Sequence, residues 1–127
     1  MYKEELTRKI IGIAMRVHRE IGPGFQERIY HQAMICALKE NKVIFENEKE
    51  FDIMYHGHWV GTFRADLVIE NKLIVELKSV VEMTKLFETQ TISYLKASNI
   101  EVGLLMNFGT RSLEVKRLAR YHHYTSV

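Results

Sequence analysis

The chain is poor in cysteine and in long apolar sequence, and each scarcity excludes a class of protein. The single cysteine, Cys36, cannot form an intrachain disulfide, which favours a reducing compartment over a disulfide-stabilised scaffold. Cys36 lies beside alanines in a helical pattern, so we expect a buried thiol rather than a nucleophile. The apolar stretch IIGIAM at residues 10–15 is too short to cross a bilayer, and the charged N-terminus lacks the pattern of a signal peptide. We therefore expect a cytoplasmic protein.

Neither sign of charge dominates the chain. Its 18 Lys and Arg residues against 16 Asp and Glu residues give a net charge of +2, which is compatible with nucleic-acid binding without being diagnostic of it. With 46% hydrophobic and 27% charged residues the composition is that of a globular protein. No linker, low-complexity tract or repeat divides the 127 residues. We expect one domain over residues 1–127, with an N-terminal helix at 4–21 and a core at 24–120.

Two helices are expected in the first third of the chain. Apolar residues at 6–21 follow the i, i+3, i+4, i+7 spacing of an amphipathic helix, which the turn Gly22-Pro23-Gly24 ends. A second helical pattern follows from about residue 25 to 41, with Glu27 and Tyr30 together on one side. The residues expected on the buried face of this helix are Ile29, Ala33, Cys36 and Ala37.

After residue 43 the hydrophobic pattern alternates with a period of two, as in strands. We expect a third helix at 84–98 with Thr84 as its N-cap, and a strand covered on both faces at the apolar run 102–108. The other expected strands are 51–55, 59–69 and 73–79, with a turn at His56-Gly57-His58, and an edge strand at 113–118. This order predicts an α/β fold with a mixed sheet flanked by helices.

Charged residues interrupt two of these apolar strands, in the stretch RADLVIENKLIVELKS at residues 64–79. A three-residue turn at 70–72, with a left-handed conformation at its last position, would pair Ile69 with Leu73. Asp66 would then lie opposite Glu76, and Lys78 would share their face. The same alternation places Phe63, Ala65, Leu67 and Ile69 together on the other face.

Two adjacent carboxylates repel each other and need a positive charge nearby. The sequence leaves two sources of this charge open. One is an ion-pair network with Arg64 and Lys78. The other is a hard divalent cation, which prefers oxygen ligands and commonly binds one or two carboxylates with water and phosphate. Two pairs of side chains on the neighbouring helices could surround this acidic patch, namely Glu27 with Tyr30 and Gln90 with Tyr94.

These residues resemble a known family. GFQERIY at residues 24–30 is similar to the GxxExxY signature of a family in the PD-(D/E)XK nuclease superfamily. Asp66 followed by Glu76-Leu77-Lys78 matches the D…ExK motif, and Gln90 with Tyr94 matches a QxxxY motif on the next helix. Ala65 replaces the proline of the superfamily motif. The resemblance covers nearly the whole chain and implies a restriction-endonuclease-like α-β-β-β-α-β core with an extra N-terminal helix.

The resemblance also implies a function, a Mg²⁺- or Mn²⁺-dependent nuclease that acts on nucleic acid, and we expect DNA in preference to RNA. Its metal ligands would be Asp66, Glu76 and the main-chain carbonyl of Leu77, with Glu27 as an accessory acid. Lys78 would activate the attacking water, and Gln90 would assist catalysis. Tyr30, Arg64 and Tyr94 would position the nucleic acid. The alternative is a catalytically silent module that binds nucleic acid or a protein partner, and a homodimer or partner would enlarge its small recognition surface.

Three other patterns have an ordinary interpretation. The basic residues Arg111, Lys116, Arg117 and Arg120 are either a phosphate-contacting edge or a solvated charged face. His56 and His58 lack a third metal ligand nearby, so we interpret them as turn residues. Gly22-Pro23-Gly24 lacks the lysine of a phosphate-binding loop, so we interpret it as a turn.

Overall fold

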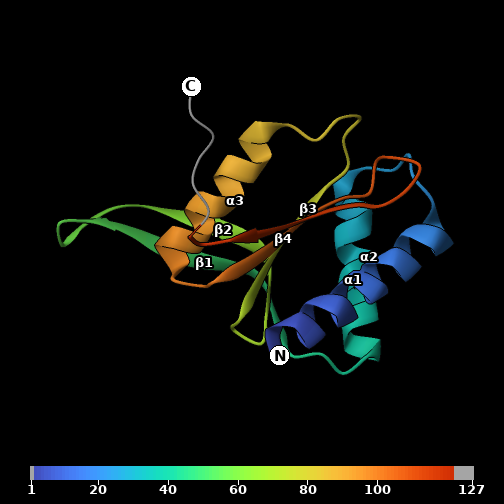
Figure 1. The fold of residues 1–127 in the computed structure, drawn as a ribbon, viewed down its shortest axis with the longest axis horizontal. Coiled ribbons are helices and arrows are strands. Elements are labelled where there is room, and N and C mark those ends of the chain that lie inside the picture. The colour runs from blue at the N-terminus through green and yellow to red at the C-terminus, as the bar shows by residue number, and fades with distance from the viewer. Residues whose placement is uncertain (1, 122–127) are drawn as a thin grey trace.

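The computed structural model describes residues 2–121, which form one mixed sheet with helices on both faces (Figure 1). The strand order is β1-β2-β3-β4-β5, and β3 and β4 are parallel while the other neighbours are antiparallel. The predicted α/β fold and its element order are confirmed. The elements are α1 (Tyr2–Ile21), α2 (Glu27–Glu40), β1 (Phe45–Tyr55), β2 (His58–Ile69), β3 (Leu73–Lys78), α3 (Lys85–Ser98), β4 (Val102–Asn107) and β5 (Glu114–Ala119).

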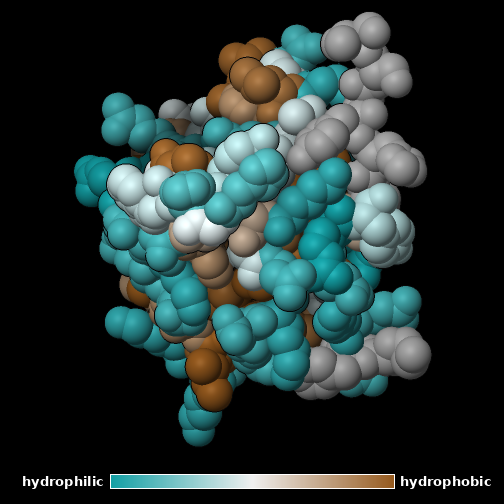
Figure 2. All heavy atoms as spheres, turned by 90° about the vertical axis from the view of Figure 1, so that its left-hand side faces the viewer, coloured by the Kyte–Doolittle hydropathy of each residue, from teal (hydrophilic) through white to brown (hydrophobic). Residues whose placement is uncertain are grey.

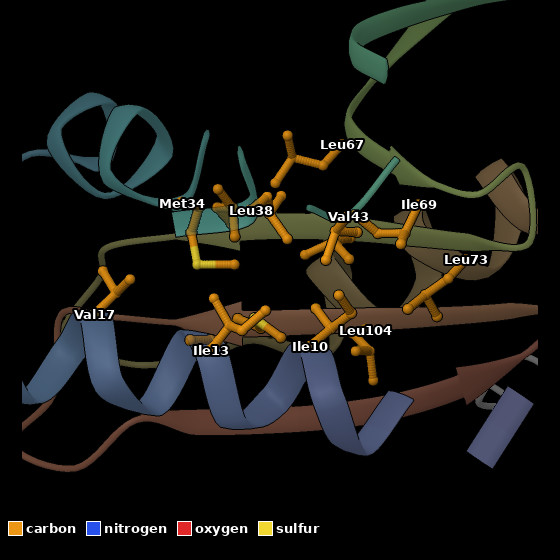
Figure 3. Close-up of a cluster of buried hydrophobic side chains, with 14 of the residues drawn as sticks. Ile10, Ile13, Val17, Met34, Leu38, Val43, Leu67, Ile69, Leu73 and Leu104 are labelled. Atoms are coloured by element: carbon orange, nitrogen blue, oxygen red, sulfur yellow. The ribbon is translucent and has the colours of Figure 1, made fainter. Parts of the chain in front are cut away.

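Helices α1 and α2 cover one face of the sheet and form the larger core with it (Figure 3). The apolar stripe of α1 packs into this core, as its spacing predicts. All six residues of β4 are buried, as expected for a strand covered on both sides. None of the helices within residues 2–121 is long and apolar enough to span a membrane. The core residues labelled in Figure 3 are Ile10, Ile13, Val17, Met34, Leu38, Val43, Leu67, Ile69, Leu73 and Leu104.

Helix α3 covers the opposite face and forms a second core with Val68, Ile74 and Leu105. Its close approach to the sheet depends on Gly103, because a Cβ atom there would lie 3.2 Å from side-chain atoms of Thr91 and Leu95. Thr84 is at the N-cap position, as predicted, but its side chain makes no capping hydrogen bond. The helix is therefore held by packing on the sheet rather than by its cap.

The buried face of α2 differs from the predicted one. Tyr30, His31, Met34 and Leu38 are buried, whereas Ile29 and Cys36 are exposed, so the expectation of a buried thiol was wrong. The prediction followed the aliphatic residues and left out the two aromatic residues with polar atoms. Both are accommodated in the core because their polar atoms are hydrogen bonded: the Tyr30 hydroxyl donates to Gly22 O, and His31 Nε2 pairs with Asn47 Oδ1 at 2.7 Å.

The connection between β2 and β3 has the predicted three residues, and Ile69 pairs with Leu73. The left-handed residues, however, are Glu70 and Asn71 rather than Lys72, with φ angles of 50° and 59°. The turn closes through a hydrogen bond of 2.9 Å from Lys72 N to Ile69 O. The strain thus falls on Glu70 and on an asparagine, which tolerates this conformation better than most residues.

Strand β2 changes faces partway along its length, so the prediction that four alternating residues share a face was wrong. Ala65 packs in the α3 core and Phe63 stacks on Tyr94 of α3, whereas Leu67 and Ile69 pack under α1 and α2. The partner strand is distorted at the same level, where Glu48 has a φ of 51° between residues 47 and 49. Strand twist and this local distortion turn the outer half of the hairpin toward α3.

The β1–β2 hairpin extends beyond the sheet, and its tip lies at the left of Figure 1 and faces the viewer in Figure 2. The predicted turn forms there, with left-handed conformations at His56 and Gly57. Large hydrophobic side chains are exposed around it, namely Ile53, Met54, Tyr55, Trp59 and Val60. A patch of this kind on a projecting hairpin is typical of an interaction surface.

Candidate metal and catalytic site

Asp66 and Glu76 lie opposite one another where β2 and β3 separate. The backbone pairing of these strands runs from Ile69–Leu73 to Leu67–Val75 and stops there. Beyond that point the acids bridge the strands with their side chains: Asp66 N donates to Glu76 Oε2 and Leu77 N donates to Asp66 Oδ2, each at 2.8 Å. The predicted register therefore brings the two carboxylates together, and the divergence of the strands makes room for their side chains.

Each carboxylate keeps one oxygen without a hydrogen bond to the described part of the chain, namely Asp66 Oδ1 and Glu76 Oε1. Ion pairs among residues 2–121 include Lys3–Glu101, Lys49–Glu46 and Lys116–Glu88, and none of the described cations lies within 4 Å of Asp66 or Glu76. The ion-pair network with Arg64 and Lys78 that the sequence left open does not form. The Glu76 side chain is 5% exposed, so its charge has neither full solvation nor a direct counter-ion.

The electrostatics of the site favour a bound proton or cation. Burial, and next the Asp66 carboxylate, raise the pKa of Glu76 from its ordinary value of 4.5 to about 8. Burial of its carboxyl group, and next Asp66, also raise the pKa of Glu27, while Lys78 opposes the increase. The pKa of Tyr94 is raised by burial and by both carboxylates. The charge of Asp66 thus acts on both Glu27 and Tyr94.

The end of β3 places Lys78 beside the carboxylates. Its ammonium nitrogen lies 4.6 Å from the centroid of the Phe87 ring, in a cation–π contact, and its carbonyl accepts a hydrogen bond from Phe108 N at 2.8 Å. The next residue, Ser79, donates through Oγ to Phe25 O at 2.6 Å. This bond ties the start of α2, and with it Glu27, to the strand that carries Glu76 and Lys78.

Asn107 holds the chain that follows Lys78, and the sequence analysis missed it. Its buried side chain accepts from Val80 N and Gly109 N and donates to Val80 O and Glu114 Oε1, over 2.8–3.0 Å. A Cβ atom on Gly109 would lie 2.6 Å from Val80 backbone atoms, so the segments are in close contact. The signal was a single amide in an otherwise apolar strand, since a buried polar group requires partners.

We expect Asn107→Leu to lower the free energy of unfolding by about 3 kcal/mol or more, because it leaves two backbone N–H groups and a carbonyl of the site without partners. Urea unfolding followed by circular dichroism measures this loss. Asn41→Leu is the matched control, because that side chain makes one bond, to Ala37 O, and should cost about 1 kcal/mol or less. Equal losses in the two variants would contradict the role of Asn107.

The remaining predicted site residues differ in their positions. Gln90 is exposed on α3, one turn before the half-buried Tyr94. Arg64 is exposed on β2, two residues before Asp66, and makes no ion pair with described residues. Leu77 is buried, and its N–H is already engaged by Asp66. The arrangement thus gathers Asp66, Glu76, Lys78, Glu27 and Tyr94. Arg64 lies between Phe63 and Ala65, which face α3, so it is on the other face of β2 and does not share the face of the carboxylates as predicted.

Tyr30 is a core residue, so a direct contact with nucleic acid is not available to it. Its side chain is 0% exposed, and its ring stacks on Phe108 with centroids 4.9 Å apart. The hydroxyl donates to Gly22 O at 2.6 Å and accepts from Phe25 N at 3.2 Å. Tyr30 fixes the turn that precedes α2, and it affects the site through the position of Glu27. The expectation that Tyr30 positions the nucleic acid therefore does not fit its place in the core.

A magnesium ion fits the donor set of this site. Among residues 2–121, no three His, Cys, Asp or Glu side chains converge on one point, so the predicted set with Glu27 is not a ready-made three-ligand cluster. Mg²⁺ does not require one, because it commonly binds one or two carboxylates and takes its other ligands from water and phosphate. The two available oxygens, Asp66 Oδ1 and Glu76 Oε1, meet that requirement.

Comparisons with known proteins bear on the fold and the family. A sequence model of the PD-(D/E)XK nuclease superfamily matches residues 4–118, which include every residue of the site described above. No curated protein matches the chain. Among solved structures, the crystal structure of SSO0001 is similar, with a TM-score of 0.59 and 23% identity over 72% of this chain and 48% of that one. The likeness concerns the fold, and the chain spans about half the length of that protein.

Proposed function

Because the chain belongs to the PD-(D/E)XK nuclease superfamily, we propose that it is a Mg²⁺- or Mn²⁺-dependent nuclease that hydrolyses phosphodiester bonds, with DNA preferred to RNA. Within the superfamily we assign it to the GxxExxY group on the strength of GFQERIY at residues 24–30. The observation that carries the proposal is a pair of hydrogen bonds, from Asp66 N to Glu76 Oε2 and from Leu77 N to Asp66 Oδ2, which leaves one oxygen of each carboxylate without a partner among the described residues. A buried acidic pair without a cation stabilises no fold by itself, so it is best explained by a ligand.

Asp66 Oδ1, Glu76 Oε1 and the Leu77 carbonyl would hold the cation, and Glu27 would reach it directly or through water. A divalent cation in this position neutralises charge on a non-bridging phosphate oxygen and makes a bound water nucleophilic near neutral pH. Burial of Glu76 serves this role, since a carboxylate that is poorly solvated binds a hard cation in place of water. The site would therefore exchange the proton of Glu76 for the metal.

Lys78 would orient the attacking water and donate to the phosphate. Its ammonium is positioned by the Phe87 ring and its backbone by Phe108, so it needs little reordering when the substrate binds. Tyr94 would act as a neutral hydrogen-bond donor, because the raised pKa of its phenol keeps the proton in place at neutral pH. Gln90 would assist at the border of the site, and Arg64 would contact the nucleic-acid backbone from β2.

One observation favours the alternative, a silent module with a protein partner. The exposed hydrophobic tip of the β1–β2 hairpin, which includes Met54, Tyr55 and Trp59, is far from the carboxylates along the strand and has no role in hydrolysis. We propose that a second copy of this chain or another protein covers the hairpin tip. We also propose that the chain acts in the cytoplasm. A partner at the tip is compatible with catalysis, so the two functions are separated by the assay below.

Removal of the metal tests the nuclease proposal. We expect the purified protein to cleave DNA with Mg²⁺ or Mn²⁺ and to lose this activity in chelator, because the acidic pair cannot neutralise a phosphate unaided. Gel analysis of labelled single-stranded and duplex DNA and RNA measures product, and calorimetry measures metal binding. No cleavage of any of these substrates, together with no metal binding, would reject the nuclease. Binding that persists in chelator and gives no product with metal would support the silent module.

A further inference from the structure

A groove runs between α1 and the edge strand β5, on the face of the sheet that α1 covers. It contains a cleft of about 470 Å³ near the end of α1, between Met15, Arg19, Arg111 and Val115, and one of about 450 Å³ near its start, between Arg8, Ile11 and Arg117. Figure 3 shows α1 running along this edge of the sheet. The proposed catalytic residues line neither cleft.

The two clefts are successive parts of one groove. Residues 8, 11, 15 and 19 lie on one face of α1 by helical periodicity. Residues 115 and 117 share one face of β5, and Val115 packs on the core beneath α1 together with Leu113, which directly precedes the strand. Arg8 and Arg19 are separated by about 16 Å, since eleven helical residues each rise about 1.5 Å. The groove therefore has an apolar floor. At each of its two ends, one arginine comes from α1 and one from β5 or the loop before it.

The four arginines, Arg8, Arg19, Arg111 and Arg117, are exposed, and their side chains make no ion pair or hydrogen bond with residues 2–121. Two other basic residues near β5 are engaged elsewhere, since Lys116 pairs with Glu88 of α3 and Arg120 donates to Asn99. Glu4, at the far end, is the acidic residue that lines the groove. The basic residues noted near the C-terminus of the sequence thus fall into two sets. Arg111 and Arg117 line the groove together with arginines of α1, whereas the other two are engaged elsewhere.

One end of the groove lies at the same end of the sheet as the carboxylates. Lys78 is in register with Asn107 of β4, and Asn107 with Glu114 of β5. Two strand spacings of about 4.8 Å separate the backbone of Lys78 from that of Glu114, so the loop that carries Arg111 begins about 10 Å from the end of β3. Glu76 faces α3, since it alternates with Val75 and Leu77 of the core under α1 and α2, so the nucleic acid would pass around this end of the sheet to enter the groove. His18 of α1 binds Thr110 O at 2.9 Å and fixes this loop against the helix. The other end, at Arg8 and Arg117, points away from the site.

We infer that this groove binds the sugar–phosphate backbone of the nucleic acid as it leaves the catalytic site, an inference that rests on the proposed function. Its length of about 16 Å corresponds to about five phosphates of one strand at 3.4 Å each in a duplex. Arginine suits this ligand because its guanidinium binds phosphate oxygens in pairs, and the apolar floor accommodates sugars. The recognition is of charge and spacing and is independent of base sequence.

Matched double substitutions test the groove. The groove variants are Arg19→Ala with Arg111→Ala, and Arg8→Ala with Arg117→Ala. The control is Lys9→Ala with Lys116→Ala, which removes the same charge from the outer face of α1 and the opposite face of β5. Binding of fluorescently labelled duplex DNA is measured by anisotropy in chelator over a range of salt concentrations. Thermal unfolding of each variant checks that the fold is intact.

We expect each groove variant to bind DNA about tenfold more weakly or worse at low salt, and to reduce the slope of log affinity against log salt by about two, since each lost phosphate contact contributes about 0.9. The control should change affinity less than about threefold. An equal loss in the control, or wild-type binding by the groove variants, would overturn the groove. Wild-type binding through the groove without cleavage of any substrate would support the groove and reject the nuclease. Cleavage by the wild type, together with normal DNA binding by the groove variants, would support the nuclease and reject the groove.

Discussion

Asp66→Asn is expected to abolish metal binding and to reduce nucleic-acid cleavage by about 10³-fold or more. The substitution preserves the bond from Leu77 N, because the amide oxygen can accept it as Asp66 Oδ2 does now. It removes the negative charge of a proposed metal ligand. The metal would stabilise the transition state by several kcal/mol, and each loss of about 1.4 kcal/mol lowers the rate tenfold. Cleavage is measured under single-turnover conditions, and Mg²⁺ affinity by calorimetry.

Two comparisons make this result specific. Asp52→Asn is the matched control, because Asp52 lies on the projecting hairpin and accepts a bond from Trp59 Nε1, so activity should not change. Lys78→Ala should lower cleavage while leaving metal affinity nearly unchanged, because Lys78 is not a proposed ligand. Wild-type cleavage by Asp66→Asn would remove Asp66 from the mechanism. Loss of metal binding in Lys78→Ala would show that the lysine positions the metal instead of the water.

The register of this site could be predicted because it depends on two discrete features of the sequence. Strand residues alternate faces, and a connection of three residues, not two, decides that Asp66 faces Glu76. A one-residue error would have placed the acids on opposite faces, so the pairing of Ile69 with Leu73 and the bond from Asp66 N to Glu76 Oε2 confirm the turn length. The conformation within the turn was less predictable, because left-handed φ values at Glu70 and Asn71 depend on the whole hairpin.

The residues that support the site were harder to predict, because their roles depend on tertiary contacts. Asn107 is conspicuous in an apolar strand, but its partners Val80 and Gly109 come from a loop whose path only the fold determines. The face of α2 was mistaken because Tyr30 and His31 can be buried only where acceptors happen to meet them. The switch of faces in β2 depends on twist, which a period of two does not describe.

The stability of the metal-free protein should fall as the pH rises from about 5 to 8, which is unusual for a carboxylate. The folded-state pKa of Glu76 is about 8, above its ordinary value of 4.5, so the native state binds the proton more tightly than the unfolded state. Below the unfolded pKa both states are protonated and Glu76 has no net effect. Between the two values folding must retain a proton that the unfolded chain releases, and stability declines.

Glu76→Gln should remove most of this decline, because the amide keeps the shape of the protonated acid and does not titrate. Each pKa unit corresponds to about 1.4 kcal/mol, so the wild type should lose several kcal/mol relative to the variant across this range. Urea unfolding in chelator at a series of pH values measures the difference, from which the titrating groups that do not interact with Glu76 cancel. Glu40→Gln, an exposed residue at the end of α2, is the control and should follow the wild type.

Addition of Mg²⁺ should reverse the effect at pH 8 in the wild type alone. A ligand that binds only the native state adds stability in proportion to the logarithm of its concentration over the dissociation constant. Because the cation requires the ionised form of Glu76, its contribution should increase with pH over the range in which the metal-free protein loses stability. Parallel pH profiles for the wild type and Glu76→Gln in chelator would show that Glu76 is ionised without metal. In that case the acidic pair would hold a cation by charge alone, without exchanging a proton for it.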